Sequence, residues 1–395
     1  MRAFLIAGET SGDKLGAALM AGLKALADDV TFDGVGGPLM QAHGLTSRFA
    51  MDELSVFGIA EVLPQYRHLK RRIAETAKAV IDTAPDVLIT IDSPDFCLRV
   101  ARLVKQRSSI RTVHYVAPSV WAWRAGRAEK MAGSIDQVLA LLPFEPPYME
   151  AAGMRCDFVG HPIVAEPRAS DVEIAAFRAE TGIGGAPMLL VLPGSRRGEV
   201  GRLTPVFGEA LRPVLDRYPE TRIVLPAAAP VAGAVIDGIR NWPGDPVVLD
   251  PRSMPDAAAT ARKRAAFAAA DYALAASGTV SLELAAADTP MVIAYDMNWF
   301  SWQRMSRTLQ TDTVTRLTLV SGSNTVPEFL GPACRPAEIA RALNDLIGDP
   351  GAQAAQRQAM ARTMRLLGRG EDPPGLRAAR AVLDGLEAIR PHDTA

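Results

Sequence analysis

The sequence predicts an α/β protein of two domains, each built on a parallel sheet, that face each other across a cleft. The chain has 395 residues, which is more than a single hydrophobic core usually serves. Short apolar segments, which we expect to be buried strands, alternate with longer helical segments through both halves. Several apolar segments lead into glycine-rich or polar turns, where parallel sheets carry their ligand-binding groups.

The first domain is expected over residues 1–165, the second over residues 166–350, and C-terminal helices over residues 351–395. Each expected strand is a short, mostly apolar run, and most are followed closely by glycine, proline or an acidic residue. The last helix has an apolar face, which we expect to pack back on the first domain or on a partner subunit of a homodimer. The expected strands are residues 3–7, 32–35, 86–91, 111–116, 137–142, 188–192, 222–226, 246–249, 272–276 and 291–295, with one more that ends at Phe158.

The overall composition excludes several classes of protein. With 48% hydrophobic and 22% charged residues, the chain resembles ordinary soluble globular proteins, and its formal net charge of −1 argues against bulk nucleic-acid binding. The three cysteines and five histidines are scattered, without the spacing of a zinc site or a disulfide framework. No apolar run approaches the roughly 20 residues that span a bilayer. We therefore expect a cytoplasmic protein, at most peripheral on a membrane.

The segment of residues 271–285 is the centre of the expected binding site. It reads as a buried strand, a turn of Ser277, Gly278 and Thr279, and the start of a helix. Unpaired amides and the positive end of the helix favour an anion there, and a diphosphate is a suitable one. Glu283, one helical turn later, could accept hydrogen bonds from the two hydroxyls of a ribose. The alternative is an ordinary capped turn between a strand and a helix.

A second glycine turn follows the strand at residues 188–192 and carries Arg196 and Arg197. An arginine at the ligand-facing end of a strand can bind a diphosphate through two hydrogen bonds and offset its charge. We therefore expect Arg196 to take part in the same anion site as Gly278.

Acidic residues follow two strands of the first domain. Glu9, Ser11 and Asp13 lie in a glycine-rich turn whose spacing matches neither a Walker A loop nor a dinucleotide fingerprint, and the alternative is a capped helix start. Asp92 and Asp95 follow the strand at residues 86–91, and one of them could remove a proton from a sugar hydroxyl. Capping of the next helix explains one of these two acids but not both.

Two further segments combine apolar and basic residues. Trp121 and Arg124 suit an amphipathic ligand, with core packing as the alternative for the tryptophan. Residues 51–64 are apolar and residues 67–72 strongly basic, which is the composition of a surface that docks on anionic lipid. The alternative is a core segment followed by a solvated helix face. The residues expected to dock are Val56, Phe57, Ile59, Val62, Leu63, Arg67, Lys70, Arg71 and Arg72.

Seven short motifs occur along the chain, at residues 8–16, 91–96, 115–124, 159–162, 192–196, 277–283 and 326–330. They include Gly-Glu-Thr-Ser-Gly-Asp-Lys-Leu-Gly, Ile-Asp-Ser-Pro-Asp-Phe and Ser-Gly-Thr-x-x-x-Glu. In this order they resemble the lipid-A-disaccharide synthase family, and the resemblance covers nearly the whole chain. It implies a GT-B glycosyltransferase fold of two Rossmann-like domains.

The resemblance also implies a reaction and its setting. UDP-2,3-diacylglucosamine would be joined to 2,3-diacylglucosamine 1-phosphate through a β(1→6) bond, with inversion and release of UDP. The setting would be the cytosolic face of the inner membrane of a Gram-negative bacterium. Because both substrates carry acyl chains, the resemblance favours membrane docking over the alternative for residues 51–72.

In similar enzymes the second domain holds UDP, so that Arg196, Ser277, Gly278 and Thr279 would face the diphosphate and Glu283 the ribose. The first domain would hold the acceptor, with Asp95 as the expected base and Glu9 and Asp92 as the other candidates. The acceptor cleft would also include Ser11, Asp13, Trp121 and Arg124. The sequence lacks an Asp-x-Asp element, so we expect no metal cofactor.

One position departs from the family pattern, and three rival functions stay open. Thr318 stands where similar enzymes often have asparagine, which would change a contact to the donor if that asparagine makes one. The rivals are another transferase that uses UDP-N-acetylglucosamine, a UDP-N-acetylglucosamine 2-epimerase on the same fold, and a non-catalytic nucleotide-sugar binder. An epimerase needs neither an apolar patch nor an acylated acceptor.

Overall fold

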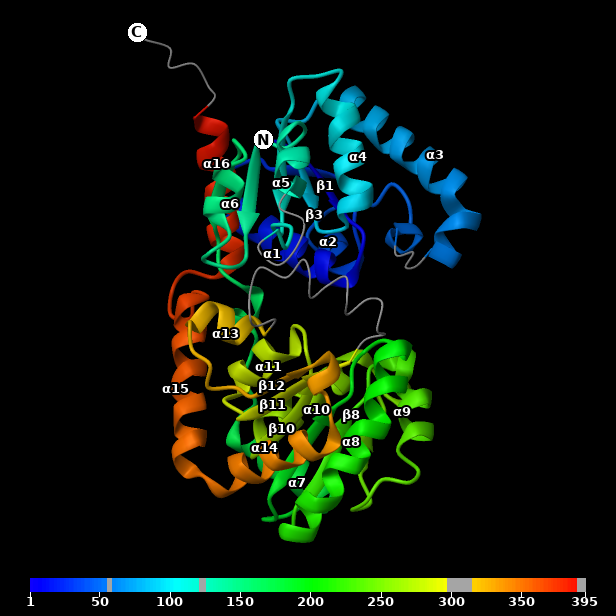
Figure 1. Cartoon of the computed structure of the whole chain (residues 1–395). Helices are drawn as coiled ribbons and strands as arrows, with labels where there is room; N and C mark the ends of the chain where they lie inside the picture. Colours follow the sequence, from blue (N-terminus) through cyan, green and yellow to red (C-terminus); the bar gives the residue numbers. More distant parts are fainter. Residues whose placement is uncertain (55–58, 121–125, 297–314, 389–395) are drawn as a thin grey trace. The chain divides into compact units, whose positions relative to one another are not determined.

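The computed structural model describes residues 1–54, 59–120, 126–296 and 315–388. The chain forms two compact units, one of Met1–Ala165 with Leu367–Ala395 and the other of Glu166–Leu366. Each unit contains one six-stranded sheet whose neighbouring strands are all parallel (Figure 1). This is the α/β architecture that the alternation of apolar and helical segments predicts.

The sheet of the first unit has the strand order β2-β1-β3-β4-β5-β6. Its inner strands are buried on both faces, because helices cover both sides. The strands are β1 (Arg2–Ala7), β2 (Thr31–Val35), β3 (Val87–Ile91), β4 (Arg111–Tyr115), β5 (Gln137–Ala140) and β6 (Arg155–Phe158).

Two hydrophobic clusters lie on the opposite faces of this sheet. Side chains of α1 and α16 contribute to one cluster, and those of α3, α4 and α5 to the other. Figure 1 labels these helices around the sheet. The helices are α1 (Thr10–Leu26), α2 (Pro38–Ala42), α3 (Ile59–Thr83), α4 (Pro94–Lys105), α5 (Gly126–Ala132), α6 (Pro146–Glu150) and α16 (Pro374–Glu387), with the 3-10 helices η1 (Met51–Leu54) and η2 (Pro162–Ala165).

The C-terminal helix α16 packs on α1 through small residues. A β-carbon on Gly22 would stand 2.6 Å from the carbonyl oxygen of Gly375, and one on Gly375 would stand 2.6 Å from that of Ala18. Gln137 in β5 also donates a 2.8 Å hydrogen bond to the carbonyl of Ala381. Of the two alternatives for the last helix, its own first unit therefore provides the packing surface.

Residues 351–395, expected as one segment of C-terminal helices, are divided between the two units after Leu366. Helix α15 stays with the second unit, because the side-chain amide of Gln356 bonds both the backbone amide (2.8 Å) and the carbonyl (3.1 Å) of Met291. Met360 and Met364 of the same helix are fully buried. Helix α16 alone joins the first unit.

The sheet of the second unit has the order β12-β11-β10-β7-β8-β9. The expected strands agree with β7 (Met188–Leu192), β8 (Arg222–Pro226), β9 (Val247–Leu249), β10 (Tyr272–Ala276) and β11 (Met291–Tyr295). The one difference is that β9 begins one residue later than expected. Strand β12 (Glu328–Leu330) is not among the expected strands; it is a three-residue edge strand that is only half-buried. Such a short strand has too few residues to show an alternating pattern.

Helices α8, α9 and α14 share one hydrophobic cluster on the second sheet. Helices α11, α13 and α15 of the same unit pack against one another (Figure 1). The helices are α7 (Asp171–Glu180), α8 (Arg197–Arg217), α9 (Ala232–Gly238), α10 (Asp256–Ala269), α11 (Val280–Ala287), α13 (Arg316–Ser321), α14 (Pro336–Gly348) and α15 (Pro350–Leu366), with the 3-10 helices η3 (Ala229–Val231), η4 (Pro251–Ser253) and η5 (Gly331–Ala333).

Each sheet has one point where the order of its strands reverses. In the first unit the chain runs from β1 to β2 on one side and then crosses to β3 on the other side of β1. In the second unit it runs from β7 through β8 and β9, and then crosses to β10 on the other side of β7. Ligands of open α/β sheets bind at the carboxyl ends of the strands that flank such a point. The turns after β1, β3, β7 and β10 are therefore the candidate ligand-binding turns.

Candidate active site

The two glycine turns of the second unit lie at its strand-order reversal. Strands β7 and β10 are parallel neighbours in which Leu192 is paired with Ala275. Their carboxyl ends therefore lie side by side at the same edge of the sheet. One leads into Gly194 and Arg196, and the other into the turn that contains Gly278. The topology thus brings together two elements that are about eighty residues apart in the sequence, each of a kind that favours anion binding.

The turn after β10 leaves room for a ligand next to its backbone. Gly278 has a φ of +149°, a backbone conformation that residues with a side chain rarely adopt. A β-carbon at this position would meet nothing within 4 Å. The hydroxyl of Ser281 donates a 2.9 Å hydrogen bond to the Gly278 carbonyl and so holds the turn. Ser277 is half-buried and Thr279 exposed. The first amides of α11, which have no acceptor inside the helix, follow this turn.

The turn after β7 differs from the one after β10, because a carboxylate already occupies its amides. Glu199 accepts hydrogen bonds from the amides of Ser195 (3.2 Å) and Arg196 (3.3 Å). Gly194, at φ +116°, is required here, since a β-carbon would stand 2.7 Å from Glu199. The Arg196 side chain is 80% exposed, with Nη1 3.6 Å from Glu199. What this turn offers to an anion is therefore the guanidinium rather than the backbone.

Glu199 is not among the residues expected from the sequence. A signal was present, because a glutamate three residues after the N-cap has the spacing at which such side chains bond the N-cap amide. The Tyr295 hydroxyl also lies 3.5 Å from Glu199, and burial raises the pKa of Tyr295.

Glu283 is in an ion pair with a residue that the sequence analysis also missed. Lys263 Nζ of α10 lies 2.6 Å from Glu283 Oε2 in the first turn of α11. The same ammonium lies 5.1 Å from the centre of the Phe267 ring. No local pattern could have signalled this pair, since its members belong to different helices.

In the first unit, the turns after β1 and β3 are in direct contact. A β-carbon on Gly8 would stand 2.6 Å from the hydroxyl oxygen of Ser93. Glu9 is half-buried and occupies the N-cap of α1, and Asp92 is half-buried directly after β3. The strand-order reversal therefore brings the segments that carry these two acids together.

Backbone strain is concentrated at this edge. Asp92 (φ +50°) and Ser93 (φ +43°) are consecutive left-handed residues, and Val116, directly after the neighbouring β4, has φ +88°. Such conformations are unfavourable for residues with a β-carbon and are most common at functional sites. The Ser93 hydroxyl oxygen is buried and has no hydrogen-bond partner among the described residues. Ser93 is thus the N-cap of α4 by position, without a capping hydrogen bond from its side chain.

The remaining acids of the first unit differ in exposure. Asp95 is exposed in the first turn of α4, and Ser11 is exposed in the first turn of α1. Asp13 is 2% exposed and accepts hydrogen bonds from the amides of Gly37 (2.9 Å), Leu39 (3.0 Å) and Met40 (2.9 Å). The expectation that Asp13 projects into a cleft is therefore wrong, because its carboxylate holds the start of α2.

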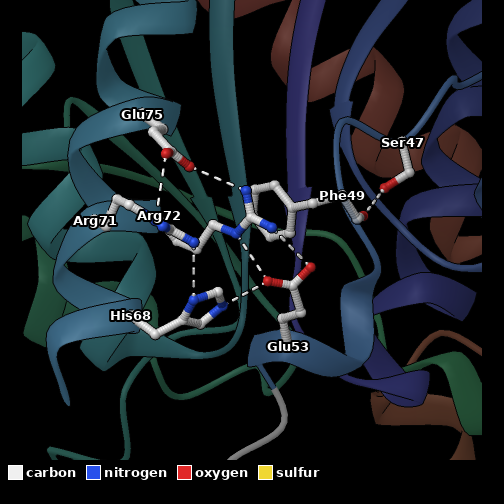
Figure 2. Close-up of polar contacts among 7 residues, drawn as sticks. All are labelled: Ser47, Phe49, Glu53, His68, Arg71, Arg72 and Glu75. Carbon is white, nitrogen blue, oxygen red and sulfur yellow. Dashed lines mark hydrogen bonds and ion pairs between the residues drawn. The ribbon is translucent and has the colours of Figure 1, made fainter. Parts of the chain in front are cut away.

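The basic cluster expected to dock on lipid has three exposed members, Arg67, Lys70 and Arg71. Arg72 differs, because its side chain is only 22% exposed and is fully engaged (Figure 2). It bonds Glu53 through Nε (2.8 Å) and Nη2 (2.9 Å), and Glu75 through Nη1 (3.0 Å). Its guanidinium also lies 4.5 Å from the centre of the Phe49 ring. Arg72 therefore fastens η1 to α3 and is not available to a lipid headgroup.

Glu53 is the acceptor at the centre of this network. His68 Nε2 lies 2.6 Å from the same carboxylate (Figure 2). Hydrogen bonding from Arg72, and to a smaller extent from His68, holds the pKa of Glu53 below its ordinary value. Met51, two residues before it, is 8% exposed and belongs to the core, so the first residue of the expected apolar docking segment does not dock.

The structure does not describe the side chains of several residues expected to bind the acceptor or dock on lipid. Val56, Phe57, Trp121 and Arg124 are outside the described residues. Ile59, Val62 and Leu63 belong to α3, but the description does not extend to their side chains.

The described residues contain neither a membrane-spanning helix nor a cluster of metal ligands. No described helix has the length and apolar character to cross a bilayer. Nor do three or more histidine, cysteine or acidic side chains of the described segments come together as metal ligands would.

Comparison with known proteins decides the family. The model of the family described as lipid-A-disaccharide synthetase (LpxB) matches residues 3–373. A lipid-A-disaccharide synthase of Ruegeria pomeroyi is 65% identical over 386 residues, which cover 98% of this chain and 96% of that protein. One of Rhodospirillum centenum is 45% identical over 384 residues, with 96% and 94% covered.

The chain belongs to the lipid-A-disaccharide synthase family. Its activity is accordingly that of a lipid-A-disaccharide synthase, a glycosyltransferase of lipid A biosynthesis. The resemblance of the seven motifs is confirmed over nearly the entire chain.

Solved structures confirm the GT-B-like fold of the chain. A UDP-GlcNAc 2-epimerase from Neisseria meningitidis, bound to UDP-GlcNAc, has a TM-score of 0.63 and 12% identity, and 98% of this chain and 100% of that chain are covered. Anabaena Alr3699/HepE in complex with UDP has a TM-score of 0.59 and 14% identity, with 98% and 100% covered. At such low identity the likeness concerns the fold alone, so the epimerase rival gains no support from it.

The departure at Thr318 has a local structural account. The residue is 4% exposed, and its hydroxyl donates a 3.1 Å hydrogen bond to Glu328 Oε1 at the start of β12. Position 318 therefore connects α13 with the edge of the second sheet.

Proposed function

We propose that this chain transfers a diacylglucosamine unit from UDP-2,3-diacylglucosamine to the 6-hydroxyl of 2,3-diacylglucosamine 1-phosphate. The product is the β(1→6)-linked disaccharide 1-phosphate, formed with inversion, and UDP is released. The observation that carries the proposal is the pair of adjacent turns at the reversal point of the second sheet, after β7 and β10. One provides a guanidinium and the other an open glycine backbone at a helix start, which together suit a diphosphate.

In the proposed donor site, Arg196 and the turn of Ser277, Gly278 and Thr279 bind the diphosphate, and Glu283 binds the ribose. The leaving diphosphate gains negative charge as the bond to the sugar breaks, so donors placed in advance stabilise the transition state. The exposed guanidinium of Arg196 and the open space beside Gly278 support this assignment.

In the proposed acceptor site, a carboxylate of the first unit takes the proton of the 6-hydroxyl. The hydroxyl oxygen then forms a bond to the anomeric carbon of the donor, and the electrons of the broken bond leave with UDP. We assign the base to Asp95, because it is exposed in the first turn of α4, directly after the strained residues that follow β3. Asp92 and Glu9 are the other candidates. Ser11, Trp121 and Arg124 are proposed to contact the acceptor.

We further propose a peripheral position on the cytosolic face of the inner membrane. Three exposed cations, Arg67, Lys70 and Arg71, lie on two successive turns of α3 and would attract anionic lipid. The apolar residues proposed to contact the lipid with them are Val56, Phe57, Ile59, Val62 and Leu63. In this position the enzyme would bind its acylated substrates while their acyl chains stay in the bilayer.

One assay tests the proposed reaction. The purified chain is incubated with both acylated sugars, and UDP release is measured with and without EDTA. UDP release that needs both sugars and is insensitive to EDTA is the expected result, whereas loss of activity with EDTA would contradict the metal-free donor site. A parallel incubation with UDP-N-acetylglucosamine alone in deuterated water would reveal exchange at C2 if the chain were an epimerase.

A further inference from the structure

We propose that Lys263 is a positioning residue of the nucleotide site, which orients the Glu283 carboxylate toward the ribose. This inference rests on the proposed role of Glu283 and adds a residue to it. Lys263 lies in α10, before β10, whereas Glu283 lies in α11, after it, so the pair joins the two helices on either side of this strand in the sequence.

The lysine ammonium is held from two directions. Its Nζ atom is 2.6 Å from Glu283 Oε2, which is a short, direct ion pair. On another side it lies 5.1 Å from the centre of the Phe267 ring, a distance at which a cation is attracted to the aromatic face. Phe267 is 4% exposed and therefore packed in the core. The ring thus anchors the lysine, and the lysine in turn anchors the glutamate.

The pair is also accessible to a ligand. Its side chains are 49% exposed at Lys263 and 33% exposed at Glu283. A carboxylate accepts up to about four hydrogen bonds through its two oxygens. Lys263 contacts Oε2, which leaves Oε1 to accept from a pair of neighbouring hydroxyls. A carboxylate whose direction is already set loses less rotational freedom when it binds them.

The simpler reading is a surface ion pair that contributes little to stability and nothing to binding. The two readings differ in what they predict for a nucleotide without ribose hydroxyls. If Lys263 acts through Glu283 on the ribose, its removal weakens binding of UDP and leaves binding of 2′,3′-dideoxy-UDP nearly unchanged. If the pair is only a surface contact, its removal changes neither affinity.

The test is calorimetric titration of the full chain with UDP and with 2′,3′-dideoxy-UDP. We expect Lys263→Met to raise the Kd of UDP by about three- to fivefold, in keeping with the loss of one partly exposed charged contact. The Kd of the dideoxy analogue should change by less than about twofold. Lys263→Arg should recover most of the UDP affinity. Equal weakening of both ligands, or no weakening of either, would overturn the proposal.

A matched control is available on the same helix. Arg262 is the adjacent residue of α10 and pairs with Glu180 of α7 at 2.8 Å, away from Glu283. Arg262→Met should leave both affinities unchanged, and a thermal unfolding curve shows that each variant is folded. An effect of Arg262→Met equal to that of Lys263→Met would assign the change to α10 as a whole, against the proposal.

Glu283→Gln separates failure of this inference from failure of the proposed donor site. If Glu283→Gln removes the difference in affinity between UDP and its dideoxy analogue but Lys263→Met does not, the donor site stands and the role of Lys263 is wrong. If Glu283→Gln leaves that difference intact, Glu283 does not bind the ribose and both assignments fail.

Discussion

Gly8 lies so close to Ser93 that a β-carbon on the glycine would stand 2.6 Å from the serine hydroxyl oxygen. The contact joins the turn after β1 to the turn after β3, at the point where the strand order of the first sheet reverses. Rotation of the hydroxyl alone would not make room, because the added β-carbon would also stand 3.1 Å from the β-carbon of Ser93 and 3.2 Å from that of Leu54. The positions of Glu9 and Asp92, each adjacent in sequence to one member of this contact, therefore depend on a glycine at position 8.

Gly8→Ala is expected to lower kcat by about tenfold to a hundredfold, because it displaces the backbone that carries the acidic residues. UDP affinity should be unchanged, since the nucleotide is assigned to the second unit. Removing the serine hydroxyl as well, in Gly8→Ala with Ser93→Ala, should restore part of the activity. The control is Gly133→Ala, because a β-carbon at Gly133 would meet nothing within 4 Å. Full activity of Gly8→Ala in steady-state assays would separate this contact from catalysis.

Asp95→Asn is expected to lower kcat by at least about a hundredfold, as the removal of a general base does. The amide has nearly the same size as the carboxylate, so UDP affinity measured by calorimetry should stay as it is in the natural protein. A fully active Asp95→Asn variant would move the base to another residue, and the same substitution at Asp92 and Glu9→Gln would then identify it.

Arg196→Ala is expected to raise the Kd of UDP by about tenfold, because a charge-assisted hydrogen bond to the diphosphate is lost. The rate of transfer should fall with it, since the same guanidinium stabilises the leaving group. Arg197→Ala is the matched control, as the neighbouring residue is also exposed but is the first residue of α8. Unchanged UDP affinity in Arg196→Ala would remove this arginine from the donor site.

Replacing Arg67, Lys70 and Arg71 with glutamate is expected to abolish binding to vesicles that contain anionic lipid, measured by sedimentation at low salt. Each exposed cation near such a surface contributes about 1 kcal/mol, so reversal of three charges is a large change. Arg72 is left intact because its ion pairs hold α3 to η1. Lys78→Glu, at an exposed position of the same helix, should have little effect. Vesicle binding by the triple variant would assign this cluster to ordinary surface.

The Glu53 network predicts a pH dependence of stability. The pKa of Glu53 is lowered in the folded state, chiefly by hydrogen bonding from Arg72, so the unfolded chain binds the proton more readily. This contribution to stability is therefore present above the ordinary glutamate pKa of 4.5 and is lost as the pH falls through the lowered value. Glu53→Gln should reduce the fall in Tm between pH 5 and the acid range, whereas Glu150→Gln, at an exposed position of α6, should not. Parallel Tm curves for Glu53→Gln and the natural protein would contradict this account.

Much of the fold can be predicted from local sequence. The strands β7, β10 and β11 coincide with the expected ones, because each is an apolar run bounded by turn-forming residues. The turn of Gly278 is also recognisable in the sequence, because a glycine separates an apolar run from a helical segment. Edge strand β12 is missed because three half-buried residues are too few to show the alternation of apolar and polar residues that marks a strand.

The partners of charged side chains could not be predicted in this way. Asp13 was expected in a ligand cleft, yet it holds the amides at the start of α2, 24 residues away at Gly37. Arg72 was expected on a lipid surface, yet it bonds Glu53, 19 residues away. In each case the partner comes from an element whose position depends on the packing of the whole unit.

The sequence by itself determined the α/β class, the family and the glycine turns after β7 and β10, because these depend on residue types over short stretches of chain. Only the tertiary structure decided which of the charged residues are engaged and which are exposed to a ligand. Lys263 and Glu283 show the physical reason: a charge interacts strongly only at a few ångströms, and the fold sets that distance between residues of separate helices.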